Sequence, residues 1–189
     1  DRGESWVDIT GDLPQRSGTW SIVQDSVDHD LLFVGTEFGV YFTVDGGRHW
    51  VELRGGIPKI QARDLHLQRQ WDDLVVGTFG RGIFILDDYS ALRDVSAESM
   101  AKDATLFRIR PTPLFEERSQ VQAVWGDKVE PNPPFGATLT YHLRSALPKG
   151  ERPVLTITDA EEQAVRLIRL RNEPGVHSVT WDLRRGDSR

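Results

Sequence analysis

The sequence predicts an all-β protein: the last blades of a β-propeller over residues 1–95, a linker over 96–110 and an Ig-like β-sandwich over 111–189. Three observations predict this fold class. A motif recurs 44 positions apart in the first half. Short runs of β-branched and aromatic residues, broken by Gly, Pro and Asp, are typical of strands. The second half alternates apolar and polar residues between turns, as sandwich strands do. A chain of 189 residues can bury two such cores.

The repeat in the first half has the pattern Asp-x-Gly-x-x-Trp. Asp1 and Asp45 are 44 positions apart, and so are Trp6 and Trp50. Four short antiparallel strands in a period of this length are typical of a propeller blade. We expect strands at residues 21–25, 31–36, 39–44 and 50–53, then at 62–68, 73–78 and 82–86. No fourth strand is evident in the second set, which fits the last blade of a ring closed by a strand from the other end of the chain.

The recurring motif has the chemistry of a tight turn between the third and fourth strands of a blade. The carboxylate of Asp45 can accept hydrogen bonds from the backbone N–H groups of its own turn, and Gly47 can adopt the positive φ that other residues resist. Trp50 then buries its ring against neighbouring strands. We therefore predict a structural role for these positions.

The motif resembles the Asp-box, or BNR repeat, of sialidases, sortilin-like receptors and many bacterial propeller proteins. The matching positions are Asp1, Gly3 and Trp6 in the first copy and Thr43, Asp45, Gly47 and Trp50 in the second. The segments "LLFVGTEFGVYFTVDGGRHW" and "LVVGTFGRGIFILDDYS" are similar to the sortilin-like, glycosyl-hydrolase-like group of large bacterial propellers, over about the first 90 residues. This resemblance implies further blades in the same ring and an exported protein, secreted or located in the periplasm or at the cell surface.

The predicted ligand surface lies on the face of the blades opposite the Asp-box turns, where propeller ligands usually bind. It is formed by the loops between second and third strands and by the connections between blades. An aromatic ring can stack on a sugar, and a guanidinium group can form a bidentate fork with an anionic group. We therefore expect a peptide or carbohydrate ligand there. The candidate ligand-binding residues are Arg81, Phe79, Glu37 and Phe38, with Arg16, Lys59, Gln61 and Arg63 beside them.

Two functions remain open from the sequence. The first, which we favour, is a non-catalytic recognition or scaffold propeller. The alternative is a glycoside hydrolase of the Asp-box group, which requires two carboxylates about 5 to 9.5 Å apart. Glu37 and Asp64 are the candidate acid and base here, and we expect most of such a pair to lie outside these residues.

No metal or cofactor is predicted. His29, His49 and His66 have no spacing that would let two of them share a metal ion. The acidic stretch at residues 25–30 lacks the glycine and closing glutamate of an EF-hand loop, so we expect a polar hairpin.

Composition excludes some partners. The net charge of −6 and the pI near 5.4 argue against nucleic acid, whose binding proteins concentrate Lys and Arg on one face. No apolar run approaches the length that spans a bilayer. The chain has no cysteine, so its redox compartment cannot be inferred. It begins inside a motif without an initiator Met, and we expect that it was cut from a longer protein.

The second half begins with the small and charged residues of the predicted linker or short helix, followed by a proline-rich stretch at 110–150. We expect strands at 137–143, 153–159, 164–170 and 177–184, with Trp181 in the core. The segments "TDAEEQAVRLI" and "PGVHSVTWDLR" resemble the small Ig-like module of flagellar hook-capping proteins and secreted bacterial enzymes. Since the last strand ends close to Arg189, we expect a sandwich that can continue beyond it.

Overall fold

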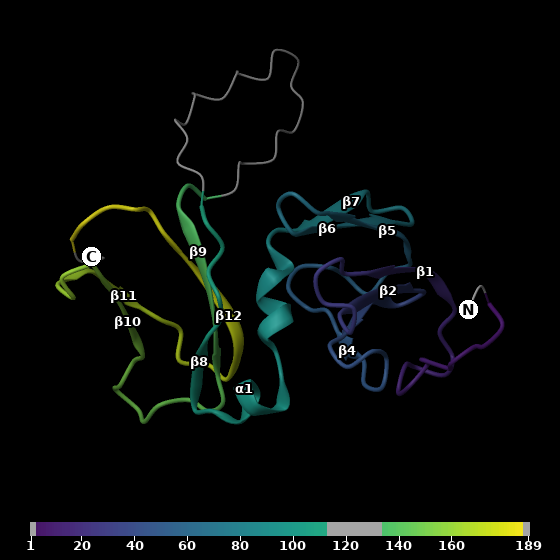
Figure 1. Ribbon diagram of the computed structural model, residues 1–189, viewed down its shortest axis with the longest axis horizontal. Coiled ribbons are helices and arrows are strands. Elements are labelled where there is room, and N and C mark those ends of the chain that lie inside the picture. The colour runs from purple at the N-terminus through teal and green to yellow at the C-terminus, as the bar shows by residue number, and fades with distance from the viewer. Residues whose placement is uncertain (1–2, 113–133, 187–189) are drawn as a thin grey trace, which may run out of the picture. The chain divides into compact units, whose positions relative to one another are not determined.

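The computed structural model describes residues 3–112 and 134–186. The chain forms two compact units, Asp1–Ser96 and Ala97–Arg189 (Figure 1). It is all-β, with 39% of its residues in strands and 7% in helices. The strands form several small antiparallel sheets, and no closed barrel is present in the described residues.

The first sheet of the first unit has four antiparallel strands in chain order. They are β1 (Thr19–Gln24), β2 (Leu32–Thr36), β3 (Gly39–Thr43) and β4 (Val51–Glu52). The fourth strand is shorter than the sequence predicts and begins at Val51. The reason is that the backbone N–H of Trp50 donates to Oδ1 of Asp12 at 2.6 Å and not to a carbonyl of β3.

The second sheet has three strands in chain order, β5 (Ala62–Gln68), β6 (Asp73–Thr78) and β7 (Ile83–Leu86), with no fourth strand in the described residues. The chain turns instead into a 3₁₀ helix, η1 (Tyr89–Asp94). Asp88 caps this helix in the left-handed conformation, and its carboxylate accepts a hydrogen bond from the N–H of Ser90. This cap follows the third strand of its sheet, where the first sheet has the turn at Asp45.

The core of the first unit lies between these two sheets (Figure 1). Its buried members are Tyr89 of η1 and apolar residues of both sheets: Leu31, Phe33, Val40, Ala62, Leu65, Leu67, Leu74 and Val76. The sheets approach most closely at Gly35 in β2, where a Cβ atom would overlap the carbonyl oxygen of Ala62. Glycine at this position therefore allows the two sheets to pack.

An enclosed ion-pair network holds η1 against the strand ends of both sheets. The carboxylate of Asp25, after β1, is 1% exposed and accepts two hydrogen bonds from Arg93 of η1, at 2.7 Å from Nε and 2.9 Å from Nη2. The same guanidinium group binds Asp72, between β5 and β6, and the hydroxyl of Tyr89 donates to Asp25 at 2.9 Å. The predicted polar hairpin at residues 25–30 thus begins with a buried carboxylate.

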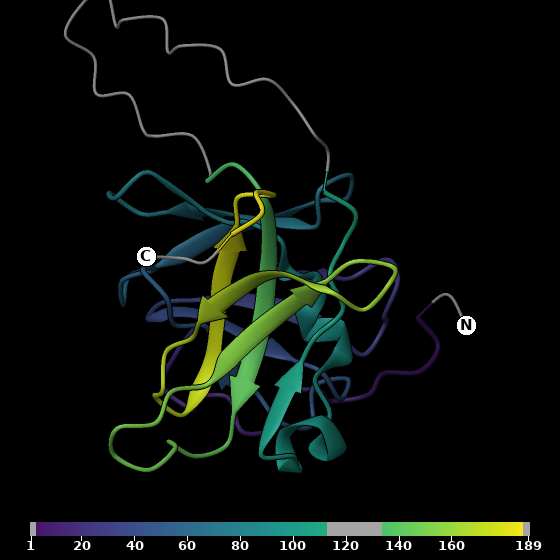
Figure 2. The ribbon, with the colours of Figure 1, turned by 90° about the vertical axis from the view of Figure 1, so that its left-hand side faces the viewer.

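The second unit contains a short helix, a three-stranded sheet and a two-stranded sheet. The helix is α1 (Ala97–Ala101). The strands of the larger sheet lie in the order β12 (Gly175–Trp181), β9 (Ala137–Leu143) and β8 (Ala104–Leu106). In the smaller sheet, β10 (Val154–Thr158) pairs with β11 (Ala164–Arg169). Figure 2 shows the smaller sheet lying across the larger one. A groove of about 270 Å³ between them is lined by Leu106, Leu139, Leu155 and Trp181 among others. Trp181 is therefore half-buried at this groove.

The stretch at residues 96–110, predicted as a linker or short helix, contains the helix α1 and also the strand β8, which the sequence did not predict. Leu106 of β8 pairs with Tyr141 of β9. Phe107 follows with 3% exposure, and its N–H donates to the carbonyl of Thr140 at 3.0 Å. A run of three strand residues is too short to stand out in the sequence, and pairing with β9 is what makes it a strand.

Candidate functional site

The first strands of the two sheets share a backbone irregularity. The pairing of β1 with β2 shifts register between Thr19 and Ser21, and the pairing of β5 with β6 shifts between Ala62 and Asp64. The residue at the shift is Trp20 in β1 and Arg63 in β5. A β-bulge bends the strand and redirects a side chain. The same irregularity therefore presents two different side chains from equivalent positions.

These two side chains meet, and Phe79 joins them from the β6–β7 loop. The guanidinium carbon of Arg63 lies 4.8 Å from the ring centroid of Trp20 and 4.3 Å from that of Phe79. We call these three residues the aromatic–arginine stack. Trp20 is 47% exposed and Phe79 58%. The stack therefore combines two large apolar rings and a cation at the solvent-accessible surface, an arrangement with attractive cation–π contacts.

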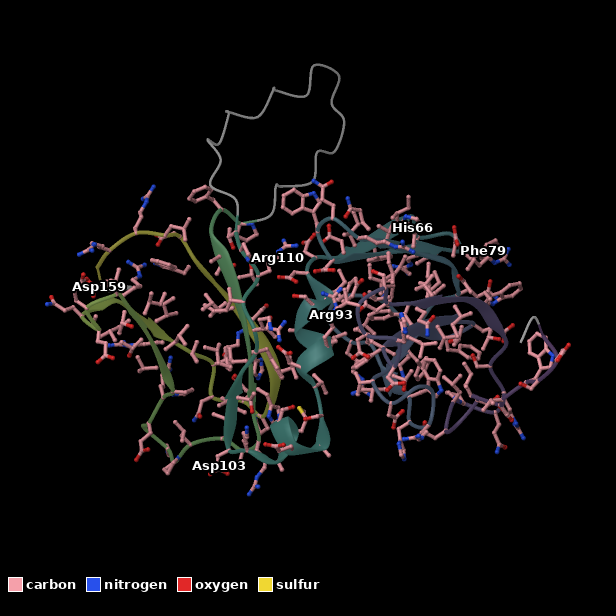
Figure 3. All side chains as sticks on the ribbon, viewed as in Figure 1. His66, Phe79, Arg93, Asp103, Arg110 and Asp159 are labelled. Atoms are coloured by element: carbon pink, nitrogen blue, oxygen red, sulfur yellow. The ribbon has the colours of Figure 1, made fainter. Side chains whose placement is uncertain are left out.

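Gln61 holds two members of the stack, Arg63 and Phe79, by hydrogen bonds. Its side-chain oxygen accepts hydrogen bonds from Nε and Nη2 of Arg63, at 3.2 and 3.1 Å. Its backbone carbonyl accepts the N–H of Phe79 at 2.9 Å. One residue thus orients both the guanidinium group and the β6–β7 loop. Figure 3 shows Phe79 at one end of the β5–β7 sheet and Arg93 at the other end of the unit.

The remaining predicted ligand residues occupy the loops at the same strand ends. Glu37 and Phe38 lie between β2 and β3, and Arg81 lies between β6 and β7. Phe38 is 54% exposed, and the side chain of Arg81 is exposed rather than buried in an ion pair at the strand end. The N–H of Glu37 donates to the carbonyl of Gly18 at 3.1 Å, which ties this loop to the segment before β1.

The candidate acid and base come from different sheets. Glu37 is half-buried in the β2–β3 loop, and Asp64 is exposed in β5 opposite Gly77. Within the described residues, no hydrogen bond joins the two carboxyl groups.

The turn at residues 43–50 uses the carboxylate of Asp45 for its own hydrogen bonds. Oδ1 of Asp45 accepts hydrogen bonds from the N–H groups of Arg48 and His49, at 3.0 and 2.9 Å, and from the hydroxyl of Thr43 at 2.7 Å. Oδ2 contacts Nδ1 of His49 at 2.7 Å. Partial burial alone would raise the pKa of Asp45, but the hydrogen bonds from His49 and Thr43 outweigh it and hold that pKa well below its usual range. The hydrogen bond with Asp45 and the negative charge of that carboxylate raise the pKa of His49.

Packing around this turn explains its glycine and tryptophan. Gly47 has φ of 94°, and a Cβ atom there would lie 2.7 Å from Cβ of Ile9. Trp50 is 8% exposed, and its indole N–H donates to the carbonyl of Ile9 at 2.9 Å. The turn chemistry predicted from the sequence is therefore present in this copy.

The first copy is different. Asp1 lies outside the described residues. Gly3 has φ of 87°, and the indole N–H of Trp6 donates to its carbonyl at 3.1 Å. Trp6 is 89% exposed, whereas Trp50 is enclosed. The two equivalent tryptophans thus have opposite environments in this chain.

Sequence reasoning did not single out Trp20, and it placed Arg63 only at the margin of the site. Trp20 stands at the start of the first strand like an ordinary strand residue, and a β-bulge cannot be recognised from the residue pattern.

The sequence also did not predict the network of Asp25, Asp72, Tyr89 and Arg93, because these residues are distant in sequence. Burial alone would raise the pKa of Asp25, but hydrogen bonds from Arg93, the Asp28 backbone and Tyr89 hold it far below its usual range.

No group of three or more His, Asp or Glu side chains that could hold a metal ion occurs in residues 3–112 and 134–186. Across those ranges, no helix has the length and apolar character needed to cross a bilayer. No protein-family model, curated protein or solved structure matches the chain.

Proposed function

We propose that the first unit forms the last blades of a β-propeller in an exported Asp-box protein of the sortilin-like group. The second unit is then an Ig-like module. The function of the ring is to recognise a peptide or glycan. The recognition surface is the end of the sheets that carries the β2–β3 and β6–β7 loops. The observation that carries the proposal is the aromatic–arginine stack, which exposes two rings and a cation at that end.

Repetition of the packing supports the propeller. Gly35 pairs with Val40 in the first sheet as Gly77 pairs with Ile83 in the second, so Val40 and Ile83 are equivalent. Val40 is fully buried by the following sheet, whereas Ile83 is 70% exposed. A further sheet of the same kind would cover Ile83 as the second sheet covers Val40, and continued stacking of this kind builds a ring.

The position of the stack supports recognition. Its two bulge residues are anchored in paired strands, and Phe79 is tied to Gln61 by a backbone hydrogen bond. Sites on rigid elements hold their geometry better than sites on free loops. The carboxylate of Asp45 is occupied by its own turn, and no hydrogen bond joins Glu37 and Asp64 in the described part of the chain. No observation on these residues therefore favours hydrolysis.

The test is a binding survey with matched variants. The chain is applied to arrays of glycans and acidic peptides, and bound ligands are titrated against wild type, Phe79→Ala, Arg81→Ala and Phe107→Ala with a melting curve for each. We expect the first two variants to weaken binding without lowering the melting temperature, because both side chains are exposed. Phe107→Ala removes a buried side chain of the second unit, so it should lower the melting temperature and leave binding unchanged. Ligands that bind Phe79→Ala and Arg81→Ala as tightly as wild type would refute this surface, and cleavage of a bound glycan would favour the hydrolase.

A further inference from the structure

We propose that the ligand of this surface is an acidic glycan, and that the guanidinium group of Arg63 binds the carboxylate of one of its uronic-acid units. The inference rests on the proposed recognition function and specifies its ligand class. It depends on the hydrogen-bonding capacity left on Arg63, on the absence of a neutralising partner and on the exposed rings beside it.

Arg63 retains a free fork of donors. A guanidinium group has five N–H donors in one plane. Nε and Nη2 of Arg63 each donate to the same oxygen of Gln61. The N–H groups that remain belong to Nη1 and Nη2, on the edge turned away from Gln61. Two parallel N–H groups on such an edge match the two oxygens of a carboxylate.

The side chain is already held in position. Trp20 and Phe79 contact its guanidinium group, and Gln61 fixes its orientation. A ligand therefore does not need to order a long flexible side chain, which commonly weakens binding to an exposed arginine. The adjacent rings also displace water from the guanidinium group, and this strengthens a charge-assisted hydrogen bond.

The charge of Arg63 is not cancelled by the protein. Two carboxylates are near in the chain or in the neighbouring loop, those of Asp64 and Glu37. Neither forms an ion pair with Arg63 within residues 3–112 and 134–186. Arg81 adds a second exposed cation from the β6–β7 loop that also provides Phe79. The surface thus offers two positive groups, which suits a polymer with repeated carboxylates.

The exposed rings favour a glycan over an acidic peptide. Trp20, Phe38 and Phe79 are 47%, 54% and 58% exposed at the same strand ends. The C–H face of a sugar ring packs on such aromatic surfaces, and a uronic acid carries its carboxylate directly on that ring. One residue can then contact a ring and the arginine fork together. An aspartate or glutamate side chain would use the fork and leave the rings uncovered.

The experiment uses the whole chain and one pair of probes. An oligogalacturonate and its methyl ester are titrated by calorimetry, because the ester keeps the sugar rings and removes the charge. We expect the ester to bind about 10- to 100-fold more weakly, as loss of a charged hydrogen-bond pair predicts. Binding of the acid should weaken as salt is raised.

Variants of Arg63 locate the effect. Arg63→Met keeps an apolar stem between the rings but removes the donors, and Arg63→Lys keeps the charge but removes the fork. Both variants should lower the affinity for the oligogalacturonate to about that for its methyl ester. Arg48→Met is the matched control, because Arg48 is an exposed arginine in the Asp-box turn at the opposite end of the sheets. It should leave both affinities unchanged.

The outcomes separate this inference from the proposed function. Equal binding of acid and ester, or acid binding that survives Arg63→Met, overturns the assignment to Arg63 and leaves recognition at this surface standing. A glutamate-rich peptide could bind in place of the oligogalacturonate and lose its binding in Arg63→Met. That result would refute the glycan as ligand and would support Arg63 as a carboxylate-binding site. Absence of binding to every glycan and peptide of the survey overturns both.

Discussion

Trp20 and Arg63 occupy the same bulged position in the first strands of consecutive sheets, and their side chains contact each other with 4.8 Å between ring centroid and guanidinium carbon. The backbone irregularity is repeated, whereas the side chain that it presents is not. A structural repeat has thus produced a composite surface in which one sheet provides the ring and the next provides the cation.

The buried Trp50 should stabilise the fold far more than the equivalent Trp6, which is exposed. Trp50→Ala is expected to lower the free energy of unfolding by about 3–5 kcal/mol, because it empties an enclosed aromatic site. Trp6→Ala should change it by less than about 0.5 kcal/mol, since that ring is 89% exposed. Denaturant unfolding of both variants measures the difference. Equal losses would show that Trp6 is packed in solution.

The close approach of the sheets should make substitution of Gly35 more destabilising than substitution of Gly77. These glycines are equivalent, but a Cβ atom at Gly35 overlaps a backbone oxygen, whereas at Gly77 its nearest neighbour is Cβ of Asp64 at 3.4 Å. Gly35→Ala should cost about 1–3 kcal/mol by overpacking. Gly77→Ala should be close to neutral. Thermal unfolding of the pair gives the answer, and similar melting temperatures would contradict the packing of the two sheets.

Arg93 is expected to be essential for stability. Arg93→Met leaves the enclosed carboxylate of Asp25 without its cation, which should cost about 3–5 kcal/mol. Arg54→Met is the control, since Arg54 pairs with Glu52 at the surface, 82% exposed, and should cost less than about 1 kcal/mol. Urea unfolding compares the two. A tolerated Arg93→Met would mean that η1 does not dock as described.

The same network contributes to the acid sensitivity of the fold, beside the depressed pKa of Asp45. The folded-state pKa of Asp25 is depressed, so its contribution to stability is present above the unfolded pKa and is lost as pH falls toward the folded one. Stability should therefore decline below about pH 4. Asp25→Asn should flatten this decline, although it also weakens the protein at neutral pH. Melting temperatures measured between about pH 2 and about pH 7 test the slope.

His49 should contribute in the opposite direction. Its folded-state pKa is raised, chiefly by the hydrogen bond with Asp45, so its contribution is complete below the unfolded pKa of about 6.5 and disappears as pH rises through the folded value. His49→Gln should therefore lower the melting temperature at acidic pH and have no effect once the histidine is neutral in both states. A constant difference across this window would contradict the pairing with Asp45.

Much of the first unit could be predicted from the sequence. Its seven strands lie within two residues of their expected bounds, because runs of β-branched and aromatic residues and the turns between them are local features. The hydrogen bonds of Asp45 could be predicted for the same reason. The expected ring and Ig-like module stay predictions, since several small antiparallel sheets are compatible with more than one architecture.

Other features were decided only by tertiary structure. Asp25 and Arg93 are 68 positions apart, and no local pattern connects them. Residues 104–106 become a strand because β9 supplies a pairing partner. The aromatic–arginine stack depends on two bulges and on the packing of one sheet against the next, which bring Trp20, Arg63 and Phe79 together. The sequence by itself therefore determined the strands and their turns, which depend on neighbouring residues. Only the tertiary structure decided which side chains meet, because those contacts depend on how separate sheets approach one another.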